Sequence, residues 1–85
     1  MQVPTVHLNG TSRDALIEQL SDAQFGIRQA IELLGKAAPN GRDYYPQGDD
    51  AFRTAHAEHE ARVARLAETA RELEELAMAI YRQGA

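Results

Sequence analysis

The sequence of 85 residues contains no cysteine, and it has neither a basic leader segment nor a long hydrophobic run. Without cysteine there is no disulfide framework and no thiolate zinc site. A secretory signal needs a basic segment followed by an apolar one, and a membrane span needs about 20 successive apolar residues. We therefore expect a cytoplasmic protein that does not enter membranes.

Basic residues are also scarce. Nine Lys and Arg residues stand against thirteen Asp and Glu residues, which gives a formal net charge of -4. A protein that holds the phosphate backbone of nucleic acid needs an excess of positive charge. The balance predicts no general nucleic-acid binding. A chain of this length forms a single domain with a thin core, which favours completion by a partner chain.

The usual signatures of catalysis and of metal binding are missing. The sequence has no P-loop, no GxGxxG and no nucleophile–base set at a recognisable spacing. His56 and His59, with Glu58 and Glu60 beside them, have only a superficial likeness to a helical metal site. Their spacing is three rather than four, and the first half of the chain has no second such motif. We expect a binding protein without a metal or cofactor, and not an enzyme.

A first helix is predicted by apolar residues that recur every three or four positions. They are Leu16, Leu20, Ala23, Ile27, Ala30 and Leu34. Thr11 followed by Asp14 fits a capping box at the start of this segment. Gly35, expected in a left-handed turn, and Pro39 beyond it are typical of a helix end. The pattern predicts a helix over about 12–34.

A second and longer helix is predicted by an unbroken heptad-like pattern. Its positions are Phe52, His56, His59, Val63, Leu66, Ala70, Leu73, Ala77 and Ile80. Asp49 or Asp50 is the expected cap, and Arg82 and Gly84 mark the end. This predicts a helix over about 50–83 that is about 50 Å long, against about 35 Å for the first.

These two segments predict an all-α fold, an antiparallel helical hairpin in one domain over residues 1–85. Residues 1–11 form an N-terminal arm. Residues 35–49 form a loop that is longer than two packed helices need, and we expect it to be functional. One short helix cannot cover the whole of the longer one. We therefore expect the hairpin to assemble with further copies into a homo-oligomeric helical bundle.

The first candidate site is the polar turn "HLNGTSRD" before the first helix, with His7, Asn9, Gly10, Thr11 and Arg13 as candidate ligand-binding residues. Its residues explain a turn and a helix cap without any ligand. The same geometry favours an anion, since a helix N-terminus presents free N–H groups and partial positive charge. An arginine there opposes the helix dipole, which indicates an anion or a carboxylate as its partner.

The second candidate site is the connection "NGRDYYPQGD", with Arg42, Asp43, Tyr44 and Tyr45. The tyrosines either close the end of the hairpin or stack on a flat ligand such as a nucleobase. An arginine offers two parallel hydrogen bonds to a phosphate, and a carboxylate accepts from a ribose hydroxyl. His56 and His59 form an expected polar layer nearby, which either fixes register or faces the ligand.

The two candidate sites belong at opposite ends of an antiparallel hairpin, about 35 Å apart by helix length. They cannot share a ligand within one chain. We therefore predict composite pockets at subunit boundaries, where a second copy packs head to tail and "NGTSRD" of one chain lies beside "GRDYY" of the next. Tyr44 or Tyr45 supplies stacking there, and Arg13 and Arg42 supply charge.

Three stretches, "HLNGTSRDAL", "PNGRDYYPQGDDAF" and "EHEARVARLAETARELEELA", resemble a group of small proteins encoded by tailed bacteriophages and prophages. The resemblance implies a phage protein in the host cell cytoplasm. Small phage proteins of this size are often anti-defence or accessory proteins, and some sequester cyclic or ADP-ribose-type nucleotide signals. We therefore expect an anti-defence protein that sequesters a small nucleotide in pockets of an oligomer. The alternative is a protein–protein interaction module, an inhibitor of a host defence protein or a virion or assembly accessory, that acts through its helical seam.

Overall fold

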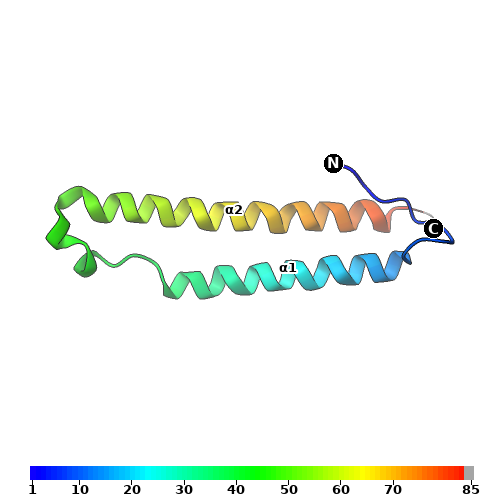
Figure 1. Ribbon diagram of the computed structural model, residues 1–85, viewed down its shortest axis with the longest axis horizontal. Coiled ribbons are helices and arrows are strands. Elements are labelled where there is room, and N and C mark those ends of the chain that lie inside the picture. Colours follow the sequence, from blue (N-terminus) through cyan, green and yellow to red (C-terminus); the bar gives the residue numbers. More distant parts are fainter. Residues whose placement is uncertain (84–85) are drawn as a thin grey trace.

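The chain folds into two long antiparallel helices joined by a compact turn region (Figure 1). This computed structural model describes residues 1–83. Helix α1 spans Arg13–Lys36 and helix α2 spans Asp49–Tyr81, and no strand occurs in residues 1–83. Two short 3-10 helices, η1 at Gly41–Asp43 and η2 at Tyr45–Gln47, lie between them. The predicted all-helical fold is confirmed, with helix ends within two residues of those expected. Gly84, a predicted stop signal, lies outside the described residues.

The ends of α1 differ from the predicted ones in chemistry. Ser12, and not Thr11, caps the helix, because the Ser12 hydroxyl accepts a hydrogen bond of 3.1 Å from the Ala15 N–H. The predicted left-handed turn at Gly35 is also wrong. Gly35 lies inside the helix, which ends when the Ala37 N–H bonds to the Leu34 carbonyl in a tightened last turn. Pro39 then prevents continuation, so no left-handed residue is needed.

Helix α2 begins at a glycine rather than at an aspartate cap. Gly48 has a φ of 107°, the only positive φ in residues 1–83, and it occupies the cap position without a side-chain hydrogen bond. Asp49 and Asp50, predicted as caps, lie in the first turn, where their charges still favour the helix N-terminus. The chain must reverse sharply after η2, and only glycine adopts this backbone conformation without strain.

The core is one thin seam between the helices. The buried residues of the described chain are Ala55, His59, Ala70 and Ile80, all on α2, and of these Ala70 and Ile80 have no exposed surface. On α1 the predicted stripe is half-buried at Leu16, Leu20, Ile27, Ala30 and Leu34. The prediction was wrong for Ala23 and His56, which are exposed. At the start of α2 the seam passes through Ala55 instead of His56.

The molecule is elongated, measuring 62 × 20 × 17 Å along its principal axes. The longer α2 extends past the end of α1, and the connection follows this overhang (Figure 1). Tyr44 of the connection is half-buried and its ring lies 6.5 Å from that of Phe52. The overhang, predicted to need another chain, is thus covered in part by residues of the same chain.

Candidate functional site

The candidate residues lie in two groups at opposite ends of the hairpin (Figure 1). The group around Arg13 adjoins the end of α2, while the group around Tyr45 adjoins its beginning. The hairpin has a long dimension of 62 Å. As the sequence predicted, the two polar turns cannot contact one ligand within a single chain.

Gln83 ties the N-terminal arm, and Arg13 ties the start of α1, to the end of α2 in what we term the terminal clasp. The side-chain amide of Gln83 accepts from the Val6 N–H at 2.9 Å and donates to the Pro4 carbonyl at 2.6 Å. Arg13 Nη1 donates to the carbonyls of Tyr81 and Gln83, each at 3.2 Å. Its guanidinium carbon also lies 5.4 Å from the centre of the Tyr81 ring. The clasp therefore joins segments from both ends of the sequence.

The clasp corrects the interpretation of Arg13. The expected partner was an anion or a carboxylate, but the observed partners are backbone carbonyls at the C-terminus of α2. These carbonyls have no partner inside their helix and carry the negative end of its dipole. An arginine beside them is satisfied without a ligand. Arg13 reaches these carbonyls because it is the first residue of α1, and antiparallel packing brings the start of α1 to the end of α2.

The other candidate residues of the first polar turn do not converge on a common ligand position. His7, Asn9, Gly10 and Thr11 are all exposed. The Gly10 N–H donates to the His7 carbonyl at 3.1 Å, which closes the turn. The His7 ring lies over Gly10, since a Cβ built there would come 2.7 Å from His7 Nε2. This turn is explained by backbone geometry.

The second polar turn presents a row of aromatic rings. Asn40 Oδ1 accepts from the Arg42 N–H at 3.0 Å and so starts η1. The rings of Tyr44 and Phe52 are 6.5 Å apart, and those of Phe52 and His56 are 5.9 Å apart. Tyr44 closes the end of the hairpin, which is one of the two roles foreseen for the tyrosines.

Tyr45, Arg42 and Asp43 are the candidate residues of this turn that are exposed to solvent. Tyr45 is 76% exposed, and Arg42 and Asp43 are also exposed. An exposed phenol ring can stack on a flat group, and an exposed guanidinium can bind a phosphate. All three residues lie in the 40–48 turn.

The two histidines do not share a role. His59 is 8% exposed and belongs to the seam between the helices. His56 faces solvent, and its Nε2 lies 3.6 Å from Glu60 Oε1. The predicted polar layer is therefore divided, with one histidine packed and one beside a carboxylate. Across residues 1–83, no three His, Asp or Glu side chains are grouped as a metal site requires.

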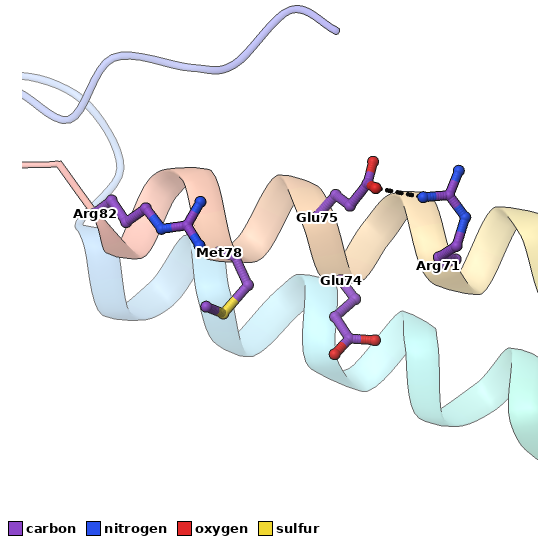
Figure 2. Close-up of a pocket in the computed structure, with 5 residues that line it drawn as sticks. All are labelled: Arg71, Glu74, Glu75, Met78 and Arg82. Atoms are coloured by element: carbon purple, nitrogen blue, oxygen red, sulfur yellow. Dashed lines mark hydrogen bonds and ion pairs between the residues drawn. The ribbon is translucent and has the colours of Figure 1, made fainter.

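A further concave surface, which the sequence reasoning missed, lies on α2 near the N-terminal arm (Figure 2). It is an open hollow of about 480 Å³. The residues that line it are Arg71, Glu74, Glu75, Met78 and Arg82. Arg71 is bonded to Glu75 and to Glu68, and the hydrogen bond from Arg71 lowers the pKa of the Glu68 carboxyl. The three- and four-residue spacing of these charges was the available signal. Arg71 is thus paired with two carboxylates of its own helix.

Comparisons of the chain with protein-family models, with curated proteins and with solved structures gave no match. The resemblance to tailed-phage proteins accordingly remains a prediction from the three quoted stretches. Functional interpretation depends on the geometry of the hairpin and on the chemistry of its surface.

Proposed function

We propose that the protein is a non-enzymatic interaction module that acts as an assembly of helical hairpins. The observation that carries this proposal is the surface left open by the fold. A compact protein of about 9.4 kDa exposes about 5,000 Å², whereas this chain exposes 6393 Å². Its radius of gyration is 18.7 Å, against about 12 Å for a compact chain of this length.

The excess is large enough for a stable interface. It amounts to about 1,400 Å² per chain, while a standard protein–protein interface takes about 800 Å² from each partner. Large apolar side chains contribute to it, since Phe25 is 65% exposed and Leu33 is 59% exposed. Neither helix of residues 1–83 combines the length and apolar character needed to cross a bilayer. We propose that these exposed apolar side chains contact other protein surfaces.

In this proposal the phage resemblance supplies the context. The assembly acts in the host cytoplasm as an inhibitor of a defence protein, or as a virion or assembly accessory. The surface concerned is not the α2 seam named in the sequence-based alternative. That seam faces α1 along most of its length and Tyr44 at its beginning.

The test is the molar mass in solution. Light scattering on the purified chain at micromolar concentration is expected to give at least twice the chain mass of 9.4 kDa. Circular dichroism on the same sample checks that the helices are intact. A monomer that keeps its full helix content would overturn the proposal, because the open surface would then be stable in water.

A second candidate function is sequestration of a small nucleotide at the 40–48 turn. The observation that favours it is Tyr45, 76% exposed on the same turn as the exposed Arg42. A base stacked on the ring and a phosphate bound by the guanidinium fit a cyclic oligonucleotide or an ADP-ribose derivative. This is the anti-defence role that the phage resemblance implies.

A thermal-shift screen with cyclic dinucleotides, cyclic trinucleotides and ADP-ribose derivatives tests this candidate. A ligand at 100 times its Kd is expected to stabilise the fold by about 2.7 kcal/mol. Tyr45→Ala and Arg42→Ala should abolish the shift. Arg28→Ala, an exposed change on α1, should leave it in place. A shift that survives both turn substitutions would remove this turn from the binding site.

A further inference from the structure

The outer face of α1 carries an ordered set of exposed residues that the hairpin does not use. Asp22, Gln29 and Lys36 follow one another at intervals of seven and are all exposed. Two turns of helix take about 7.2 residues, so these three lie within about 40° of one line. Phe25 and Leu33 are each four residues from Gln29 and flank the line on either side.

This face points away from α2. Ile27 is half-buried in the seam and lies two residues from Gln29, which places it about 160° around the helix. Phe25 and Leu33 are nevertheless 65% and 59% exposed. Within residues 1–83, neither Asp22 nor Lys36 takes part in an ion pair. The face therefore offers unpartnered apolar and charged groups together.

The order of these residues is self-complementary. Suppose that a second copy of α1 lies antiparallel to the first, with the two-fold axis at Gln29. A residue a given number of positions before Gln29 then faces the residue of the second copy that lies the same number of positions after Gln29. Asp22 then faces Lys36 of the second copy, and Phe25 faces Leu33. Both contacts occur twice, as a two-fold interface requires. Acid thus meets base at the two ends of the contact and apolar meets apolar inside them, while Gln29 on the axis meets its own copy.

Gly26 is an independent indication of close approach on this face. A glycine inside a helix is unfavourable, because it leaves more conformational freedom to the unfolded chain. Packing within the chain does not require it, since a Cβ built on Gly26 would have no atom within 4 Å. A second helix lying close to α1 gives the missing side chain a physical reason.

We propose that a second copy of the chain packs on the outer face of α1, antiparallel and centred on Gln29. This inference rests on the proposed function, because it names the surface through which the hairpins assemble. The stretch from Asp22 to Lys36 is about 21 Å long. Together with the excess surface of the chain, it provides a continuous contact for the second copy.

The arrangement has a consequence for the two polar turns. Arg13 lies sixteen residues before Gln29, about 24 Å from the axis. The terminal clasp aligns the start of α1 with the end of α2. The beginning of α2 therefore lies about as far from Gln29 along the hairpin as Arg13 does, but toward the other end. The two-fold operation thus brings the 7–13 turn of one copy to the level of the 40–48 turn of the other. These turns then flank a shared boundary between subunits.

The absence of cysteine makes the axis directly testable. Gln29→Cys is expected to give a covalent dimer on mild oxidation, because a residue on the axis meets its own copy. Ser21→Cys is the matched control, since Ser21 is exposed on α1 but about 80° away around the helix. It should stay largely monomeric on a reducing-agent-free gel under the same conditions.

Charge exchange provides the second test, read by sedimentation over a range of concentrations. Asp22→Lys or Lys36→Asp alone should raise the dimer Kd by about tenfold, since like charges then face each other. The double variant should return it to near the value of the unaltered chain. Phe25→Ser should also weaken the dimer, and because Phe25 is exposed the hairpin itself should stay folded.

The possible outcomes distinguish a failure of this interface from a failure of the proposed self-assembly. A helical monomer at all concentrations overturns both. An oligomer that ignores Phe25→Ser, shows no rescue in the double variant and does not cross-link through position 29 overturns this face alone. In that case the chains assemble through another surface.

Discussion

Ala70→Asp is expected to unfold the hairpin. Ala70 is completely buried, with 0% of its surface exposed, at the middle of α2. An aspartate there places an unpaired charge between two helices, which costs several kcal/mol. A domain of this size has a total stability of about 4 to 13 kcal/mol. We expect a loss of more than about 4 kcal/mol, measured by urea unfolding followed by circular dichroism.

The matched control is Ala67→Asp on the same helix. Ala67 is three residues from Ala70 and is exposed. The substitution has the same helix propensity cost and the same charge, so it isolates burial. It should change the free energy of unfolding by about 0.5 kcal/mol or less. Equal unfolding midpoints for the two variants would mean that the seam does not pass through Ala70.

Arg13→Ala is expected to release the N-terminal arm and to lower stability by about 2 kcal/mol. The substitution removes two hydrogen bonds to carbonyls at the end of α2 and the contact with the Tyr81 ring. Amide hydrogen exchange provides a local measurement. The Val6 N–H, which bonds to Gln83 in the intact clasp, should lose its protection.

Arg28→Ala serves as the control for Arg13→Ala. Arg28 is exposed on α1, and within residues 1–83 it takes part in no ion pair. Its removal should leave both stability and the protection of Val6 nearly unchanged. If Val6 stays protected after Arg13→Ala, the Gln83 side chain holds the arm without the help of Arg13.

The helices and their pairing follow from local patterns in the sequence. Heptad-like spacing gave both helices to within two residues, because an amphipathic stripe is a local property of the chain. The count of two helices and one polar connection then left an antiparallel hairpin as the simple packing. It also placed the two polar turns at opposite ends, since that follows from connectivity alone.

The tertiary structure decided which local signals are used. The cap at Ser12 and the positive φ at Gly48 replaced the expected Thr11 and Asp49, because a cap depends on where the backbone turns. His59 entered the seam while His56 did not, since His59 lies one turn after the buried Ala55 on the same face of α2 and His56 lies about 100° away from Ala55. The partners of Arg13 lie 68 and 70 positions away in the chain. No local pattern specifies them, because free carbonyls at a helix end attract an arginine only after packing has brought the two ends together.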